Sequence, residues 1–256
     1  MLLVIDIGNT NTVLGFFDGD EAIGSWRIET SSSRTHDELG VMLQMFAATQ
    51  QRELADVDSA ILACVVPSAA YPMLRMCREY ARVEPLQVGP GIKTGVPILY
   101  DNPRDVGADR IVNAVAAHHL VGDATVVVDF GTATTFDCIR ADGSYLGGVI
   151  APGFQISAEA LFKATSKLPR VEPGRPPSVI GRNTIHSIQS GLYFGYVELV
   201  DGMCRRIREE MQLPGARVLA TGGLAPLIAK GSSAIDQVVE DLTLLGLRLL
   251  HRRNQS

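Results

Sequence analysis

The segment Leu2–Asp20 reads LLVIDIGNTNTVLGFFDGD, and it decides how the rest of the chain is interpreted. Four apolar residues lead to Asp6, and residues 8–12 are only Gly, Asn and Thr before the apolar run VLGFF begins. Two apolar runs joined by such residues and closed by the turn Asp18-Gly19 are typical of a β-hairpin that leads into a third strand. The segment from Asp6 to Thr12 contains an acid but neither Lys nor Arg, and this combination needs a chemical explanation.

The same pattern occurs a second time, in residues 127–139, which read VVDFGTATTFDCI. A turn follows each copy, at Asp18-Gly19 and at Asp142-Gly143, and leads into a further strand-like run. An internal repeat of this kind indicates two copies of one supersecondary unit. Aligned by position, the copies match Asp6 with Asp129, Gly8 with Gly131 and Thr12 with Thr135.

Alternating helical and buried-strand patterns follow each hairpin. Thr35, with Glu38 three residues later, predicts a capped helix, and the run DVGADRIVNAVAAHHL predicts a helix that begins near Gly107. The repeated pattern predicts an α/β protein of two lobes, each a mixed sheet that begins with a three-strand meander and is flanked by helices. We place the lobes at residues 1–118 and 119–256. Further helices are expected over residues 67–82, 154–168, 184–211 and 242–251.

Composition narrows the class of protein. A chain of 256 residues with 46% apolar residues is long enough to bury a core in each of two lobes. The net charge of −5 argues against a nucleic-acid partner. The four Cys residues form no C-x-x-C pair, which favours reduced thiols in the cytoplasm over a zinc site or disulfides. Because Asp6 interrupts the first apolar run and no run approaches a membrane span, we expect a cytoplasmic protein without a membrane partner.

The two loops have the composition of phosphate-binding loops. A strand that ends in Asp and continues into a Gly-containing turn presents backbone N–H groups on one concave surface, and Thr and Asn side chains add further donors. A metal ion can supply the positive charge, held by the acid, usually through water. Two such loops would hold a polyphosphate between two lobes. The alternative, ordinary hairpin turns left by an old duplication, is disfavoured because the pattern opens two matching strand arrays.

A third turn has a related character. The run VLATGGLAP ends a buried strand at Gly222-Gly223 and starts a helix near Pro226. Paired glycines allow the close approach of a flat group such as adenine or ribose. A strand-to-helix connection that needs a positive φ is an equally good explanation of these glycines.

Six motifs in order carry a resemblance to the type III pantothenate kinases, the enzymes of the first committed step of coenzyme A synthesis. They are DIGNTNT, YDNPRDVGADRIVNA, DFGTATTFD, GGVIAPG, GRNTIHSIQSGLYFG and ATGG, and they run from residue 6 to residue 223. The resemblance implies the superfamily of acetate and sugar kinases, heat-shock chaperones and actin, with two ribonuclease-H-like lobes. It also implies ATP-dependent phosphorylation of pantothenate to 4'-phosphopantothenate by a homodimer whose substrate pocket lies near the subunit interface.

The resemblance further implies roles for individual residues. Asp109 would be the catalytic base, Asp6 would lie near Mg²⁺ and hold it through water, and Asp129 would hold a monovalent cation, K⁺ or NH₄⁺. The residues expected to contact ATP are Asp6, Ile7, Gly8, Asn9, Thr10, Asn11, Thr12, Val13, Thr132, Gly222 and Gly223. The residues expected to line the pantothenate pocket are Tyr100, Gly107, Ala108, Asp109, Arg110 and Thr184.

The chemistry of the residues is compatible with these roles, although each has a structural alternative. Transfer of a phosphoryl group to an alcohol needs a group that removes the proton, and a carboxylate suffices. Asp109 in a first helical turn should stay ionised near the positive helix end, but such acids also merely complement the helix dipole. Arg110 suits a substrate carboxylate or a salt bridge with Asp105 or Asp101. Tyr100 suits a half-buried strand end, and Thr184 suits a helix N-cap.

Three other functions remain open from the sequence. The loops are equally compatible with another small-molecule kinase of the same superfamily, since only residues 100–110 report on the acceptor. A nuclease would need three or four converging carboxylates and usually a basic surface, which this acidic chain lacks. A non-catalytic nucleotide-binding regulator would keep the loops, but the presence of Asp6, Asp109 and Asp129 together argues against it.

Overall fold

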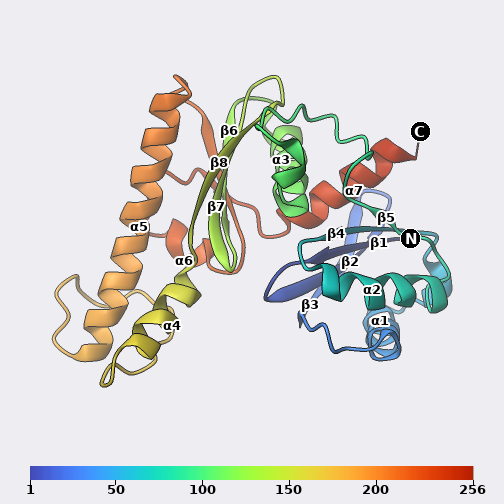
Figure 1. The fold of residues 1–256 in the computed structure, drawn as a ribbon, viewed down its shortest axis with the longest axis horizontal. Coiled ribbons are helices and arrows are strands. Elements are labelled where there is room, and N and C mark those ends of the chain that lie inside the picture. Colours follow the sequence, from blue (N-terminus) through green and yellow to red (C-terminus); the bar gives the residue numbers. More distant parts are fainter. Residues whose placement is uncertain (256) are drawn as a thin grey trace. The chain divides into compact units, whose positions relative to one another are not determined.

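The structure of the protein is a computed structural model that describes residues 1–255, which form two compact units (Figure 1). Unit 1 comprises Met1–Val96, Asp101–Ala116 and the C-terminal segment that begins at Thr243. Unit 2 comprises Pro97–Tyr100 and Ala117–Leu242. Within residues 1–255, no helix combines the length and the apolar character needed to cross a bilayer.

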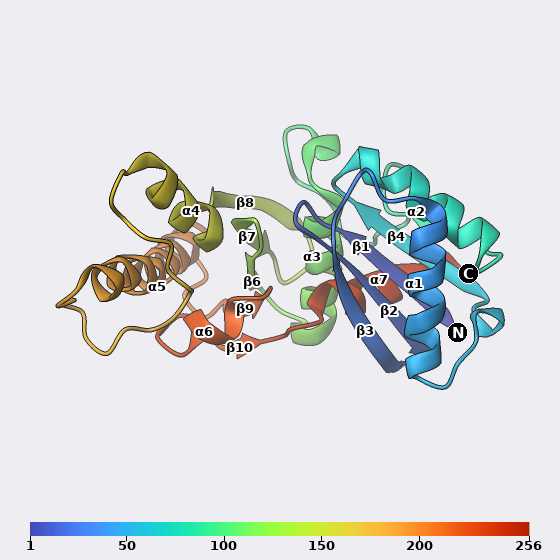
Figure 2. The same cartoon turned by 90° about the horizontal axis from the view of Figure 1, so that it is seen from below.

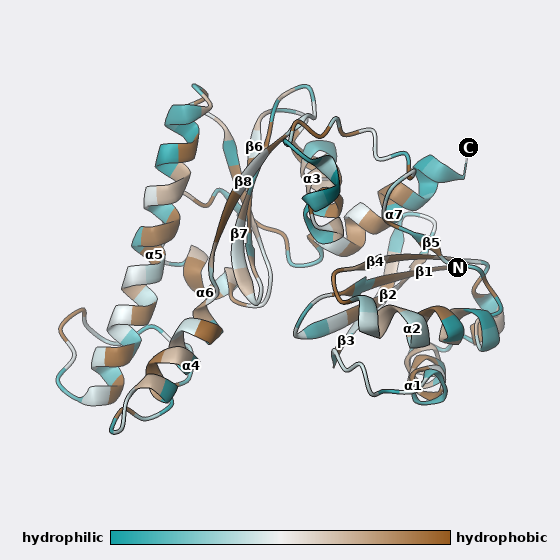
Figure 3. Cartoon of the chain, in the orientation of Figure 1, coloured by the Kyte–Doolittle hydropathy of each residue, from teal (hydrophilic) through white to brown (hydrophobic). Residues whose placement is uncertain are grey.

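Unit 1 is built on a five-stranded sheet in the order β3-β2-β1-β4-β5. The strands β1 (Leu2–Ile7), β2 (Asn11–Asp18) and β3 (Glu21–Glu29) form an antiparallel meander. The strands β4 (Ser59–Cys64) and β5 (Leu86–Gln87) extend the sheet in parallel with β1. Both β1 and β4 are brown in Figure 3, as expected for strands that are covered on both faces.

Helices cover both faces of this sheet. The chain forms α1 (His36–Thr49), η1 (Leu54–Asp56), α2 (Pro67–Glu79), η2 (Pro103–Asp105), α3 (Ala108–Val121) and α7 (Leu242–Asn254). Leu3 and Ile5 of β1 pack in one cluster with residues of α1 and α2. The other face meets α7, because a Cβ atom placed on Gly15 would lie 3.1 Å from both Leu244 and Val4.

Unit 2 repeats the arrangement, as Figure 2 shows from below, with a sheet in the order β10-β9-β6-β7-β8. Its strands are β6 (Thr125–Phe130), β7 (Ala133–Ile139), β8 (Tyr145–Pro152), β9 (Arg217–Thr221) and β10 (Gln237–Val238). Its helices are α4 (Phe154–Ala164), α5 (Thr184–Glu210) and α6 (Ala225–Ala229), which share one apolar cluster with β6 and β7. The predicted fold class, with mixed sheets that begin with a three-strand meander and are flanked by helices, is therefore confirmed.

The compact units differ from the lobes expected at residues 1–118 and 119–256 by a boundary two residues earlier, after Ala116, and in two larger groupings. The terminal helix α7 groups with unit 1, because Leu244, Leu247 and Leu250 are buried and Gly246 packs directly on Val112. Residues 97–100 group with unit 2, where Ile98 forms a bridge with Tyr145 at the edge of the sheet. Neither grouping has a local sequence signal, because both depend on tertiary contacts.

Register corrects one detail of the repeat. Ile7 pairs with Thr12 in unit 1, and Phe130 pairs with Thr134 in unit 2. Residues 8–11 separate the first pair and residues 131–133 the second, so the first turn is one residue longer. The position-by-position match of Thr12 with Thr135 was therefore wrong, and Thr134 is the equivalent of Thr12.

Candidate functional site

Loop 1, residues 8–10 between β1 and β2, is closed by its own backbone. The N–H of Gly8 donates to the carbonyl of Asn11 at 3.0 Å. Asn9, Thr10 and Asn11 are exposed, whereas Thr12 is buried. The polar groups of Asn9, Thr10 and Asn11 are therefore accessible from solvent, whereas the Thr12 side chain packs within the structure.

Asp6 is the second-last residue of β1, and only Ile7 separates it from loop 1. It pairs with Ala63 in β4, and the negative charge of Asp6 adds to burial in raising the pKa of the Cys64 thiol. The N–H of Val65 donates to the carbonyl of Ile7 at 3.0 Å, which fixes the end of β4 beside loop 1. The Asp6 carboxylate is thus held at the same end of the sheet as the loop.

Asp109 lies in the first turn of α3, also in unit 1. Its Oδ1 accepts a hydrogen bond from the N–H of Arg110 at 2.8 Å. A Cβ atom on Gly107 would lie 2.5 Å from this Oδ1 and 3.8 Å from Val65 Cγ1, so the glycine leaves room for the carboxylate beside the end of β4. Asp109 and Asp6 therefore belong to the same end of unit 1.

Burial has the larger effect on the Asp109 carboxyl. Desolvation raises its pKa above the ordinary value, and the backbone N–H and the charge of Arg110 offset the shift only in part. The sequence suggested that the helix end would decide its ionisation, and the structure shows that desolvation opposes that effect. A carboxylate with a raised pKa is a stronger proton acceptor, which suits a general base. Arg110 itself is buried, with 8% of its surface exposed.

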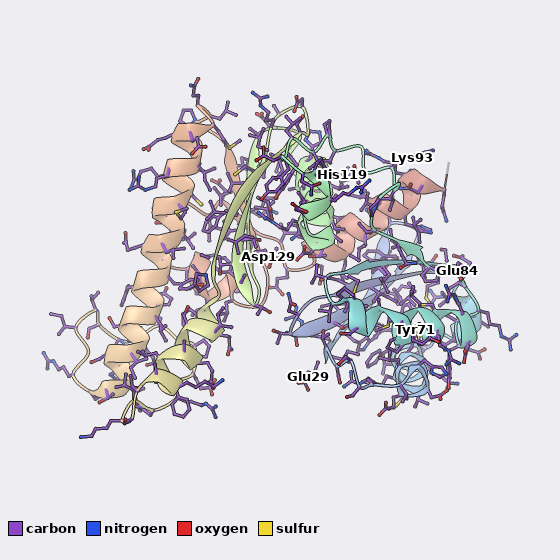
Figure 4. All side chains as sticks on the ribbon, viewed as in Figure 1. Glu29, Tyr71, Glu84, Lys93, His119 and Asp129 are labelled. Carbon is purple, nitrogen blue, oxygen red and sulfur yellow. The ribbon has the colours of Figure 1, made fainter. Side chains whose placement is uncertain are left out.

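Loop 2 consists of residues 131 and 132, between β6 and β7 of unit 2. The turn that follows β9 packs beside the residues that precede this loop. Asp129 is at the end of β6 (Figure 4), opposite Thr135 in β7 and Thr221 in β9. Gly222 has a φ of +90°, and a Cβ atom there would lie 2.6 Å from the carbonyl of Phe130 and 2.8 Å from Asp129 Oδ1. The structure thus brings Gly222 against Asp129, and it confirms the explanation that the strand-to-helix connection needs a positive φ at this glycine.

The glycine that precedes α4, Gly153, packs on loop 2 and was not predicted from the sequence to do so. A Cβ atom on Gly153 would lie 2.0 Å from the carbonyl oxygen of Thr132 and 2.8 Å from that of Gly131. Gly153 is the last residue of the motif GGVIAPG, which was recognised but given no role. Its close packing places the N-terminus of α4 directly on loop 2.

Two predicted pantothenate residues lie in other parts of unit 2. Tyr100 follows the short bridge at Ile98 and packs 3.4 Å from the Cβ position of Gly147 in β8. Thr184 is the first residue of α5, and the N-cap is Asn183, whose side chain accepts from the N–H of His186 at 2.8 Å. The alternative that Thr184 is itself the cap is therefore wrong.

Thr184 lines a cavity of about 620 Å³ in unit 2. The walls come from the C-terminal end of α4, the N-terminal part of α5 and the segment between them. The other lining residues are Leu161, Leu168, Gly181, Arg182, Asn183, Ser187, Ile188, Gly191 and Leu192. An exposed hydroxyl beside Arg182 and apolar walls suits a small amphipathic ligand with an anionic group.

Asp6 and Asp129 fit metal ions that receive most of their ligands from elsewhere. Within residues 1–255, His, Cys, Asp and Glu side chains form no group of three or more suited to a metal ion. Protein sites for Mg²⁺ in phosphoryl transfer use one or two carboxylates together with water and phosphate oxygens. A single carboxylate beside a loop of backbone donors has the chemistry of such a site.

Comparison with known proteins agrees with this chemistry. The family model described as type III pantothenate kinase matches residues 2–206. The chain belongs to the type III pantothenate kinase family. The type III pantothenate kinase of Anaeromyxobacter sp. (strain K) is 56% identical over 255 residues, 100% of both chains, and that of Myxococcus xanthus is 54% identical over 256 residues, 100% of both chains. The type III pantothenate kinase of Geobacillus kaustophilus is 52% identical, covering 99% of this chain and 98% of the relative.

Solved structures share the fold of this chain. A protein of Campylobacter jejuni described as a Baf-family transcriptional activator aligns with a TM-score of 0.61 at 17% identity, covering 99% of this chain and 98% of that one. A protein of Porphyromonas gingivalis described as an N-acetylglucosamine kinase aligns with a TM-score of 0.54 at 10% identity, covering 100% of both chains. At these identities the likeness concerns the fold alone.

Proposed function

We propose that the protein transfers the γ-phosphoryl group of ATP to the primary hydroxyl of pantothenate, giving 4'-phosphopantothenate in the first step of coenzyme A biosynthesis. The observation that carries the proposal is the full-length match, at 52–56% identity, to relatives named type III pantothenate kinase. The second support is the geometry of Asp109, a partly buried carboxylate of raised pKa in the first turn of a helix. The proposal involves a cytoplasmic enzyme and neither nucleic acid nor a membrane.

In this proposal Asp109 accepts the proton of the pantothenate hydroxyl as the phosphoryl group arrives. In a loose transition state the proton leaves late, so positioning matters more than strong basicity. Arg110 would bind the pantothenate carboxylate, and Tyr100, Gly107, Ala108 and Thr184 would complete the substrate contacts. These assignments are carried over from the family motif and are open to mutation one at a time.

ATP would be bound by Asp6–Val13, by Thr132 and by Gly222-Gly223. When bound, Mg²⁺ neutralises negative charge on the transferred phosphate. Asp6 would hold Mg²⁺ through water, and Asp129 would hold a monovalent cation, K⁺ or NH₄⁺. The absence of Lys and Arg from both loops supports this dependence on cations.

Catalysis should therefore fail without Mg²⁺ and weaken without K⁺. We expect removal of Mg²⁺ by a chelator to abolish turnover, and replacement of K⁺ by Na⁺ to lower it by about tenfold or more, since a metal-dependent phosphate site loses several kcal/mol of charge stabilisation without its ion. The measurement is pantothenate-dependent release of ADP in matched K⁺, NH₄⁺ and Na⁺ buffers. Equal rates in all three buffers would contradict the monovalent site.

The same assay tests the acceptor. Release of ADP should require pantothenate and should not occur with sugars or simple carboxylic acids. Turnover with one of those acceptors and none with pantothenate would instead indicate another kinase of the superfamily. Tight binding of ATP with no turnover on any acceptor would indicate a nucleotide-binding regulator.

We also propose that the active form is a homodimer. Unit 2 exposes large apolar side chains around the start of α5: Val179, Ile180 and Ile185 are 64%, 81% and 50% exposed. Such a patch beside the cavity that contains Thr184 is typical of a protein interface. We therefore expect a dimer in sedimentation at micromolar concentration, and its dissociation on Ile180→Asp. A wild-type protein that sediments only as a monomer would refute this part of the proposal.

A further inference from the structure

A single hydroxyl group outside loop 1 ties the loop to the end of β3. The side chain of Thr30, which directly follows β3, donates to the carbonyl of Gly8 at 2.8 Å, and its backbone N–H donates to the carbonyl of Thr10 at 2.9 Å. The hydroxyl is also 2.8 Å from the Thr12 hydroxyl. Because the one proton of Thr30 goes to Gly8, Thr12 is the donor in that contact. One residue thus fixes three points around loop 1.

A hydroxyl group also ties down the strands that border loop 2, and it comes from a different element. The Tyr196 hydroxyl, on α5, donates to the carbonyl of Pro152 and lies 3.1 Å from the Thr134 hydroxyl. Thr134 is the register equivalent of Thr12. Tyr196 is held in place by an edge-to-face contact with Phe154, whose ring centroid is 5.4 Å away.

The two arrangements are equivalent in position although the residues differ. Asn11 pairs with Glu29 in unit 1, and Ala133 pairs with Pro152 in unit 2, so the residues that follow, Thr30 and Gly153, correspond. Figure 4 labels Glu29, which ends β3. A side chain cannot fit at Gly153, where a Cβ atom would lie 2.0 Å from the carbonyl oxygen of Thr132. In unit 2 the hydroxyl that meets Thr134 instead comes from Tyr196 on α5, which also donates to the carbonyl of Pro152.

The geometry points to Thr30 and Tyr196 as positioning residues that hold the two loops in the shape that binds the phosphates of ATP. A planar trans peptide directs its N–H opposite to its carbonyl. With the carbonyls of Gly8 and Thr10 turned toward Thr30, the N–H groups of Asn9 and Asn11 point away from it, and neither carbonyl can face an anionic phosphate. Preorganised donors lose less free energy of binding to ordering. This inference rests on the proposed function, because it assigns the loops to ATP.

The test in unit 1 compares Thr30→Val, which removes the hydroxyl at nearly constant shape, with Thr30→Ser, which keeps it. We expect Thr30→Val to raise both the KM for ATP and the Kd for Mg-ATP about tenfold, which corresponds to about 1.4 kcal/mol, with the KM for pantothenate within about twofold of wild type. Thr30→Ser should restore ATP binding. Thr49→Val is the matched control, since the Thr49 hydroxyl only donates to the carbonyl of Phe46, at 2.7 Å, on α1.

The test in unit 2 uses a neighbour on the same helix as its control. Tyr196→Phe should weaken Mg-ATP binding about fivefold to tenfold, because Pro152 and Thr134 lose their shared partner. Tyr193→Phe removes a buried hydroxyl that has no hydrogen-bond partner within the described residues, and it should leave ATP binding unchanged. If Tyr196→Phe lowers only the melting temperature, the hydroxyl is structural and its positioning role is refuted.

Binding and turnover separate this inference from the proposed function. Calorimetry of Mg-ATP binding does not need an acceptor, so it reports on the loops even if pantothenate is not the substrate. Unchanged ATP affinity in both Thr30→Val and Tyr196→Phe overturns the inference while leaving the kinase assignment intact. Weakened affinity in variants of an enzyme that ignores pantothenate would support the inference and overturn only the acceptor. If Thr30→Val does not fold, Tyr196→Phe alone decides.

Discussion

Replacing Asp109 by Asn is expected to lower kcat for pantothenate phosphorylation by about a thousandfold, within the range that general base catalysis contributes. The change keeps the shape of the side chain and removes its ability to accept the proton of the hydroxyl. The KM values for ATP and pantothenate should stay within about twofold, because the lost interaction belongs to the transition state. Steady-state kinetics of the purified variant provide the measurement.

The raised pKa of Asp109 adds two expectations of definite sign. Activity needs the carboxylate, so kcat should fall as the pH drops through the pKa of Asp109. The midpoint of this fall in the pH profile of kcat should lie above the ordinary Asp pKa of about 3.9. The fold favours the protonated form, so ionisation above that pKa removes stability. Near neutral pH, Asp109→Asn should therefore melt at the same temperature as wild type or higher.

A control variant separates catalysis from general damage. Asp105, which ends η2, is exposed and accepts from the side chain of Asn102 at 2.8 Å. Asp105→Asn should keep nearly full activity. If Asp109→Asn retains more than about a tenth of wild-type kcat, Asp109 is not the base, and the first-turn acid serves only the helix dipole.

Replacing Gly153 by Ala is expected to give the largest effect among residues that do not touch the reacting atoms. The backbone at Gly153, with φ −68° and ψ 158°, suits any residue, so the effect is steric. The added Cβ would lie 2.0 Å from the carbonyl oxygen of Thr132, which forces loop 2 and α4 apart. We expect a loss of about 1–3 kcal/mol in the free energy of unfolding and about a hundredfold lower kcat/KM, as for a displaced catalytic element.

A second glycine provides the control. Gly202 lies inside α5, and a Cβ atom there would meet no atom within 4 Å. Gly202→Ala should keep activity and stabilise the protein by about 0.5–1 kcal/mol, because alanine loses less backbone freedom in a helix. Chemical denaturation and kinetics of both variants, compared with wild type, give the measurement. A Gly153→Ala variant that melts and turns over like wild type would show that α4 does not need to pack on loop 2.

Local patterns in the sequence were sufficient for much of the fold. The repeated hairpins with Asp at the strand ends predicted the two meanders, and both occur with matching strand order. Thr35 and Glu38 predicted a capping box, and both of its hydrogen bonds are present. These features were predictable because strand alternation, turns and caps depend on residues close in sequence.

Features that depend on contacts between residues distant in sequence could not be predicted from the sequence. The match of Thr12 with Thr135 assumed turns of equal length, and only strand register revealed the extra residue in the first turn. Gly153 stood in a motif that was given no role, and only its distance to Thr132 revealed the close packing. The ionisation of Asp109 depends on burial that composition does not report. The site was thus predictable as a set of motif residues, but its supporting contacts were not.

Direct identification of the product tests the central claim most plainly. Purified protein is incubated with Mg-ATP, K⁺ and pantothenate, and the mixture is analysed by mass spectrometry and ³¹P NMR, with Asp109→Asn in parallel. We expect wild type to form a phosphomonoester on the primary hydroxyl of pantothenate, one for each ADP released, and Asp109→Asn to form almost none. Wild type that binds Mg-ATP but leaves pantothenate unmodified would contradict the account.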